Sequence, residues 1–232
     1  MTDGDIRVAT FDCYGTLIDW EGGAAGFLAN LCLRDDDPSP GPGRVLRERW
    51  EAIQFEIIQG RYQPYKAILA ESLRAWVAER GLPWDEADGE ALARSMRSWQ
   101  PFPDTRPALS QVREAGVRLV ILSNTDRDII SHSLRQLEVP FDDVITAEEC
   151  GSYKPDERNF AALADRVGLP PEQILHVAAG YAYDVQPAHR LGFRTAWVNR
   201  HVEAVPGAAT PDYQWRDLWG LTALAGGPGP GI

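Results

Sequence analysis

Asp12 is the residue of this sequence best placed to do chemistry. Residues 8–11 form an apolar and β-branched run that is typical of a buried strand, and the chain then turns at Gly15. In open α/β sheets, ligands bind beyond the carboxyl ends of the strands. A carboxylate in that position can bind a cation or attack an electrophile. The alternative is that Asp12 only caps the turn that follows the strand.

Ser123 and Asn124 follow a second apolar run, at residues 119–122. Their hydroxyl and amide groups can donate hydrogen bonds to an anionic oxygen, although the same pair also forms ordinary turns. We expect them at the same edge of the sheet as Asp12.

Lys154 and Asp184 complete the set of polar positions near strand ends. Pro155 is expected to begin a helix and to direct Lys154 inward, where its ammonium would keep Asp12 ionised. The alternative is a solvated surface lysine. Asp184 could take a proton from a water molecule or complete an ion pair, or it could be the N-cap of the next helix.

From residue 101 onward, strand and helix patterns alternate. Strands are expected at residues 118–122, 144–145, 174–178 and 194–198, and helices at 108–115, 128–137, 156–167 and 184–191. This alternation predicts an α/β fold, a doubly wound parallel sheet with helices on both faces. The polar positions would then face one crevice.

Residues 20–99 have a different pattern, with helix candidates at 24–33, 44–59, 65–80 and 85–99 and no strand signal between them. The third candidate carries an apolar stripe at helical spacing. We therefore expect an α/β core formed by residues 1–18 and 100–232, with a helical domain of residues 19–99 inserted after the first strand.

The composition limits the possible partners. The chain has 232 residues and a net charge of −11, which argues against binding to nucleic acid or to an anionic membrane surface. No apolar run approaches the roughly 20 residues that span a bilayer, and the acidic start does not resemble a signal peptide. Three widely separated cysteines indicate reduced thiols and a cytoplasmic protein. The tail after Asn199 is rich in glycine and proline, and residues 226–232 are expected to be frayed.

The order Asp12, Thr16, Ser123, Lys154-Pro155 and Asp184 resembles the haloacid dehalogenase-like hydrolase superfamily. This resemblance implies a Rossmann-like core with a cap domain, which the helical insertion would form.

Two positions distinguish branches within that superfamily. Its phosphatases carry a second aspartate two residues after the nucleophile and an acidic magnesium ligand in the last motif, where this sequence has Tyr14 and Ala179. The sequence is therefore most similar to the metal-free L-2-haloacid dehalogenases, which also have tyrosine at the first of these positions. The resemblance implies an enzyme without metal or cofactor, a small carboxylate substrate and a homodimer.

The resemblance also implies roles for individual residues. Asp12 would attack a saturated carbon and form an ester, which water activated near Asp184 would hydrolyse to an inverted hydroxy acid. Lys154 would keep Asp12 anionic. The remaining candidates would position Asp12, bind the substrate or keep the pocket dry, namely Thr16, Ser123, Asn124, Tyr14 and Trp20.

Several positions depart from the dehalogenase pattern. Glu51 stands where those enzymes have an arginine, although Arg47 or Arg49 could take that role one turn away. The other departures are Phe160 in place of tyrosine and, in the last motif, Ala179 and Tyr181 in place of serine and asparagine. We expect Glu51, Phe160 and Tyr181 to face the substrate.

An unpaired Glu51 would oppose an anionic substrate and could favour a cationic group. This keeps open the hydrolysis of another C–X bond or of a strained C–N bond, as in azetidine-2-carboxylate hydrolase, whose first motif has the form seen at residues 11–20. A phosphatase and a binding protein without catalysis are the further alternatives.

Overall fold

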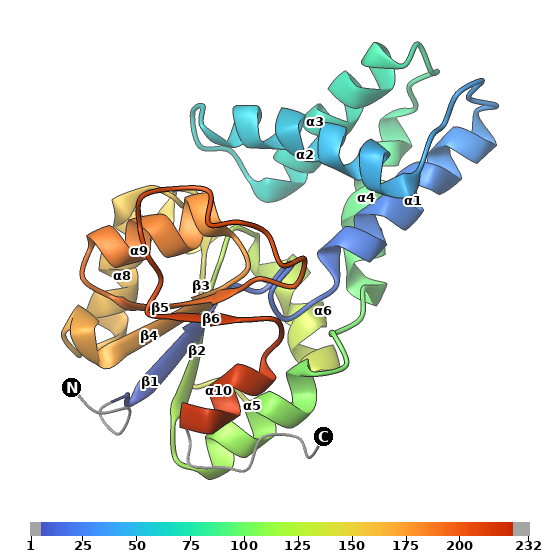
Figure 1. Ribbon diagram of the computed structural model, residues 1–232. Coiled ribbons are helices and arrows are strands. Elements are labelled where there is room, and N and C mark those ends of the chain that lie inside the picture. Colours follow the sequence, from blue (N-terminus) through green and yellow to red (C-terminus); the bar gives the residue numbers. More distant parts are fainter. Residues whose placement is uncertain (1–5, 225–232) are drawn as a thin grey trace.

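The computed structural model describes residues 6–224, so the expected frayed segment at 226–232 lies outside the described residues. Figure 1 shows a sheet flanked by helices and, beside one end of it, a separate group of helices. Within the described residues, no helix is both long and apolar enough to cross a membrane.

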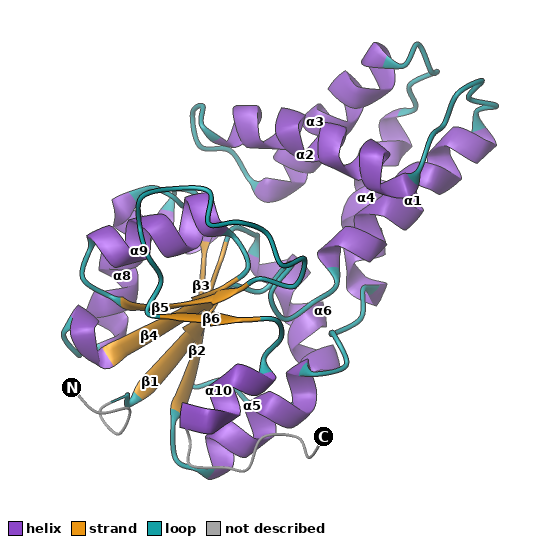
Figure 2. Cartoon of the chain, in the orientation of Figure 1, coloured by secondary structure: helices purple, strands orange, loops and turns teal. Residues whose placement is uncertain are grey.

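The sheet contains six parallel strands and confirms the predicted doubly wound α/β core (Figure 2). The strands are β1 (Val8–Phe11), β2 (Arg118–Ser123), β3 (Asp143–Thr146), β4 (Ile174–Ala178), β5 (Arg194–Val198) and β6 (Tyr213–Trp215). Their order is β3-β2-β1-β4-β5-β6. The chain first adds strands on one side of β1 and then on the other, so the switch point of the topology lies at β1. Ligands bind at such points in sheets of this class.

Alternation along β1 explains the two faces of the sheet. Ala9 and Phe11 pack into one apolar cluster, which also receives side chains from α5 (Thr105–Glu114), α6 (Arg127–Leu137) and α10 (Trp219–Leu224). Val8 packs into the cluster on the other face, together with side chains from α8 (Glu157–Val167) and α9 (Gln186–Arg190). The core also contains α7 (Ala147–Cys150), η3 (Pro171–Gln173) and η4 (Tyr181–Val185). Strand β6 and the helices α7, η3 and α10 were not expected from the sequence.

The inserted segment folds into α1 (Trp20–Arg34), α2 (Gly43–Ile58), α3 (Tyr65–Glu79), α4 (Glu86–Ser95) and the short η2 (Met96–Ser98). Helix α1 begins four residues before the expected start, because the Asp19 side chain accepts a hydrogen bond from the backbone of Gly22 and caps it. At Gly23 an added Cβ would lie 2.4 Å from the Trp99 ring, so the close approach of these two segments requires glycine.

The chain passes between the core and the helical insertion twice, and the two connecting segments lie side by side. Ile18 and Pro101 form an antiparallel bridge, and the Asp19 N–H donates to the Gln100 carbonyl at 2.8 Å. We propose that this paired crossing separates a core of residues 1–18 and 100–232 from a cap of residues 19–99. A second link comes from Asp126 of the core, which accepts hydrogen bonds from the first backbone N–H groups of α3, those of Tyr65 (2.8 Å) and Lys66 (3.0 Å).

Candidate active site

Asp12 lies at the carboxyl end of β1, and its backbone N–H still donates to Val177 of β4 at 3.2 Å. The chain then turns at Gly15, whose φ of 92° favours glycine. This turn brings Thr16 back, so that its hydroxyl donates to Asp12 Oδ2 at 2.9 Å. The Thr16 oxygen in turn accepts from the Ala179 N–H at 2.9 Å. The Asp12 carboxylate is therefore buried and oriented by the turn that follows it.

Lys154 is buried at the centre of the site and does not behave as a surface lysine. Its Nζ donates to Asp12 Oδ1 at 2.9 Å, to Asp184 Oδ1 at 2.6 Å and to the Leu122 carbonyl at 2.9 Å. All three ammonium hydrogens are therefore used. The position of this lysine depends on Asn124, whose side chain accepts from the Lys154 N–H at 2.7 Å and donates to its carbonyl at 3.0 Å.

Asp184 completes the ion pair and lies within the π-helical turn η4, so it is not the N-cap of a helix. Its Oδ1 also accepts from His176 Nε2 at 2.9 Å, and His176 Nδ1 lies 2.9 Å from the Thr10 hydroxyl. An ionised carboxylate only accepts, so Nε2 carries the proton. The second oxygen, Asp184 Oδ2, is buried and has no protein partner within residues 6–224.

The charges of this centre are strongly coupled. Burial raises the pKa of Asp12 above its ordinary value, although Lys154 opposes the shift. Burial alone would lower the pKa of Lys154, but Asp12 and Asp184 outweigh it and raise that pKa. Burial would likewise raise the pKa of Asp184, yet Lys154 and His176 lower it. The site therefore holds two carboxylates around one ammonium, and Asp12 is a desolvated carboxylate.

Ser123 and Asn124 have different surroundings. The Asn124 side chain is occupied by the backbone of Lys154. The Ser123 hydroxyl is buried at the end of β2 and has no partner in the described part of the chain. Ser123 is therefore the better candidate for hydrogen bonding to a bound anion, whereas Asn124 holds Lys154 in place.

Aromatic side chains surround the space between core and cap. Trp20 stacks on Trp50 with ring centroids 5.6 Å apart, and Tyr14 meets Trp99 edge-on at 6.5 Å. The Tyr14 hydroxyl is bonded to Ser133, and burial raises its pKa well above the ordinary value, so Tyr14 contributes an aromatic ring rather than an acid. Tyr183, one residue before Asp184, packs on Phe55 of α2 at 6.1 Å.

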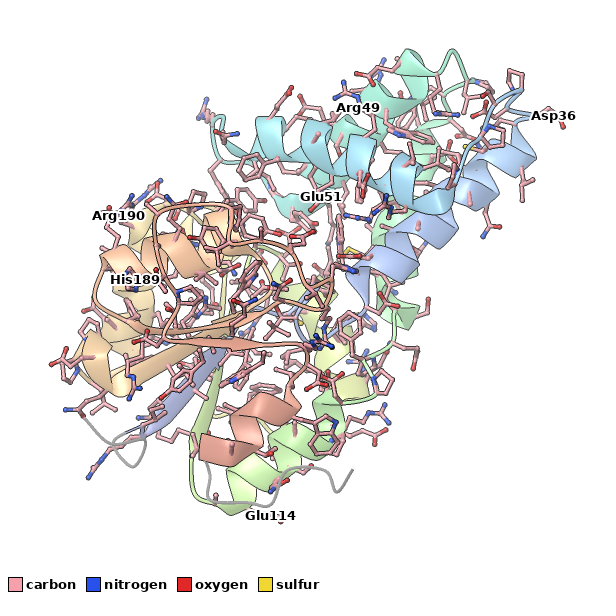
Figure 3. All side chains as sticks on the ribbon, in the orientation of Figure 1. Asp36, Arg49, Glu51, Glu114, His189 and Arg190 are labelled. Atoms are coloured by element: carbon pink, nitrogen blue, oxygen red, sulfur yellow. The ribbon has the colours of Figure 1, made fainter. Side chains whose placement is uncertain are left out.

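Glu51 lies on the side of α2 that faces the core, whereas Arg49 points away from it (Figure 3). Glu51 is paired, because its carboxylate accepts a hydrogen bond from Arg47, so the argument from an unpaired Glu51 does not apply. Burial raises the pKa of Glu51, and Arg47 opposes this shift. Arg49 pairs with Glu79 at the surface and cannot take the role of a cap arginine at the site.

Phe160 and Tyr181 are held by contacts within the core. Phe160 is fully buried, edge-on to His176 at 5.6 Å, so it can affect the site only through that histidine. The Tyr181 hydroxyl donates to the Ala209 carbonyl, and its ring packs on Trp197 at 5.4 Å. Full burial in the core contradicts the expectation that Phe160 faces the substrate. The expectation for Tyr181 stays a prediction.

Three residues near the site were missed from the sequence, namely His176, Tyr183 and Tyr65. His176 carried a weak signal, since a polar side chain interrupts the apolar run of β4. Tyr183 and Tyr65 carried none, because buried aromatic residues are common in any core.

Comparison with known proteins agrees with the family resemblance of the sequence motifs. The family model for haloacid dehalogenase-like hydrolases matches residues 6–192. The chain is 30% identical to an (S)-2-haloacid dehalogenase of Pseudomonas fluorescens, over 84% of this chain and 86% of that one. It is 29% identical to (S)-2-haloacid dehalogenase H-109 of Pseudomonas putida, over 92% and 95% of the two chains.

Solved structures agree with these sequence relationships. A crystal structure of an L-2-haloacid dehalogenase superimposes with a TM-score of 0.84 at 28% identity, over 96% of this chain and 99% of that one. The L-2-haloacid dehalogenase of Xanthobacter autotrophicus shares the fold, with a TM-score of 0.80 at 24% identity over 96% and 99%. Sequence, fold and the geometry around Asp12 thus lead to one conclusion: the chain belongs to the haloacid dehalogenase-like hydrolase family.

Proposed function

We propose that this protein hydrolyses the carbon–halogen bond of a small 2-haloacid by way of an ester on Asp12. The observation that carries the proposal is the Asp12 carboxylate, which is buried and hydrogen-bonded to Lys154 and Thr16. A second carboxylate, Asp184, pairs with the same lysine, and its Oδ2 has no hydrogen-bond partner within residues 6–224. The relatives named above support the substrate class, because they carry the names of 2-haloacid dehalogenases.

In the first step, an Asp12 oxygen attacks C2 of the haloacid from the side opposite the halogen. A C–O bond forms, the carbon–halogen bond breaks, and the electron pair leaves with the halide. Burial removes the water that would weaken a carboxylate nucleophile, and Lys154 keeps that carboxylate ionised. We expect the Ser123 hydroxyl, which is buried and has no partner within residues 6–224, to bind the substrate carboxylate.

In the second step, water attacks the carbonyl carbon of the Asp12 ester. Asp184 Oδ2 is the acceptor that can hold this water and take its proton, while Oδ1 remains bonded to Lys154 and His176. The ester breaks between the acyl carbon and the ester oxygen, so Asp12 is regenerated. One haloacid and one water give one 2-hydroxy acid, one halide and one proton.

Lys154 also bears on the need for a metal. Its ammonium lies between the Asp12 and Asp184 carboxylates and supplies the positive charge there. We therefore expect EDTA to leave the rate unchanged. An activity that EDTA abolishes and magnesium restores would contradict the proposal.

The test of the proposed function is halide release from chloroacetate, fluoroacetate and each enantiomer of 2-chloropropionate. Azetidine-2-carboxylate and p-nitrophenyl phosphate test the alternative activities on the same enzyme. In a single turnover in heavy-oxygen water, the first hydroxy acid should carry an unlabelled oxygen from Asp12. Labelled product in that first turnover would mean that water attacks the substrate directly.

The oligomeric state and the cellular location of the enzyme are also part of the proposal. We expect a homodimer by family resemblance, which light scattering on the purified chain would test. We also expect the enzyme to work in the cytoplasm, which agrees with free thiols at Cys13, Cys32 and Cys150. Fractionation of the source cells would test this location.

A further inference from the structure

Gln54 is a buried polar side chain of the cap that the mechanism above does not use. It lies on α2, one turn after Glu51, and is 6% exposed. Its Nε2 has no hydrogen-bond partner within residues 6–224. An amide nitrogen buried without a partner is costly, so its presence calls for an explanation, and a bound ligand is one.

The orientation of this amide follows from its neighbours. The Tyr65 hydroxyl donates to Gln54 Oε1 at 3.4 Å. An amide oxygen can only accept, so the Tyr65 hydroxyl gives its proton to Gln54. The side-chain oxygen of Gln54 therefore faces Tyr65, and its two N–H groups remain for another acceptor.

Tyr65 connects this amide to the catalytic centre. Its backbone N–H donates to Asp126 of the core, and its ring lies 6.3 Å from that of Tyr153, the residue before Lys154. Phe55, the residue after Gln54, packs on Tyr183 with ring centroids 6.1 Å apart, and Tyr183 directly precedes Asp184. This stretch of α2 therefore lies against the core beside the catalytic carboxylates.

We propose that the Gln54 amide receives the leaving halide, with Tyr65 fixing its orientation. This inference rests on the proposed function. In a displacement from behind, the leaving group points directly away from the attacking oxygen. Asp12 attacks from the end of the sheet, so the halide departs toward the cap. A donor placed there stabilises the charge that develops in the transition state.

Arg47 is the competing candidate, since it is the only arginine close to Glu51 on the same helix. Its guanidinium is bonded to Glu51 and lies within 3.9 Å of Glu21 and 3.6 Å of Glu48. Three carboxylates around one cation leave no net positive charge to attract an anion. We therefore assign the cap-side donor to the neutral amide of Gln54 and a structural role to Arg47.

The test compares leaving groups in single-turnover reactions. Chloride carries a more concentrated charge than bromide and depends more on a hydrogen-bond donor. Gln54→Met keeps the length of the side chain and removes the donor. We expect halide release from 2-chloropropionate to slow by about 10- to 100-fold, and release from 2-bromopropionate to slow several-fold less. Gln59→Met, at the exposed C-cap residue of the same helix, is the matched control and should leave both rates unchanged.

Tyr65→Phe provides a second measurement that does not depend on whether Gln54→Met is stable. Loss of the hydroxyl frees the amide to rotate, so we expect the same preference for bromide at a smaller loss of rate. In the double variant Gln54→Met/Tyr65→Phe the loss should not exceed that of Gln54→Met alone, because the hydroxyl acts through the amide.

If Gln54→Met slows halide release from both substrates equally, the inference is overturned. It is also overturned if Arg47→Met, and not Gln54→Met, slows release from 2-chloropropionate more than from 2-bromopropionate. In either case the wild-type enzyme still releases halide, and the proposed function stands. A wild-type enzyme that releases no halide from any haloacid would instead refute the proposed function and the inference with it.

Discussion

Replacing Lys154 with methionine is the most informative perturbation of the catalytic centre. The substitution keeps an unbranched side chain but removes the ammonium that donates to Asp12, Asp184 and the Leu122 carbonyl. Both carboxylates remain buried and now face each other without a cation between them. Removing one partner of a buried ion pair costs about 3–5 kcal/mol, and we expect a loss of stability in that range at pH 7.

The pH dependence of this loss follows from the two carboxylates. Without Lys154, the folded-state pKa values of Asp12 and Asp184 both rise, because nothing then offsets burial and mutual repulsion. A carboxyl whose folded pKa lies above its unfolded value binds a proton more tightly in the folded state. The variant therefore loses stability as pH rises above about 4, with a slope of up to about 1.4 kcal/mol per pH unit for each such group.

Urea unfolding of the wild type and the variant between pH 4.5 and 7.5 measures this effect. The difference in unfolding free energy should be small at acidic pH and grow toward neutrality. Lys66→Met is the matched control, since Lys66 is the other lysine of the chain and its side chain is half exposed. Adding Asp184→Asn to the Lys154 variant should restore part of the lost stability. A pH-independent difference below about 1 kcal/mol would refute the proposed coupling of charges.

Three further substitutions test the site and its link to the cap. Asp12→Asn should release no halide while its circular dichroism remains that of the wild type, and appreciable turnover would exclude Asp12 as the nucleophile. Thr16→Val removes the hydroxyl that donates to Asp12 Oδ2, so the single-turnover rate should fall by roughly 10- to 100-fold; an unchanged rate would mean that this bond does not matter. Asp126→Ala removes the carboxylate that caps α3, and urea unfolding should show a loss of about 0.5–2 kcal/mol, whereas Asp128→Ala at the surface should change stability by less.

Most of the core could be predicted because local pattern and tertiary structure agree there. Strands β4 and β5 were expected with the bounds they have, and β2 within a residue, since buried parallel strands are short apolar runs between glycine and polar stops. The site was predictable for the same reason. Asp12 and Lys154 follow from strand ends and from the order of motifs, and the turn at Gly15 requires little beyond local geometry.

The remaining elements depend on contacts that no local pattern contains. Strand β6 has three residues and exists because Tyr213–Trp215 pairs with β5 across a segment rich in glycine and proline. The same holds for side chains. Whether Glu51 faces a ligand or Arg47 depends on a rotamer. Phe160 was misplaced because it lies on α8 and its neighbour His176 comes from strand β4, a separate element of the chain.

The core and the cap contribute differently to the site. In the core, Asp12, Lys154 and Asp184 form a set of charges in which one ammonium pairs with both carboxylates. The cap presents a different kind of surface, in which Arg47 is neutralised by carboxylates and Gln54 offers uncharged donors. A change in the cap can therefore alter which leaving group is favoured without disturbing the ionisation of the nucleophile. For this reason we expect leaving-group preference to follow Gln54, and the pH dependence of the ester-forming step to follow the core.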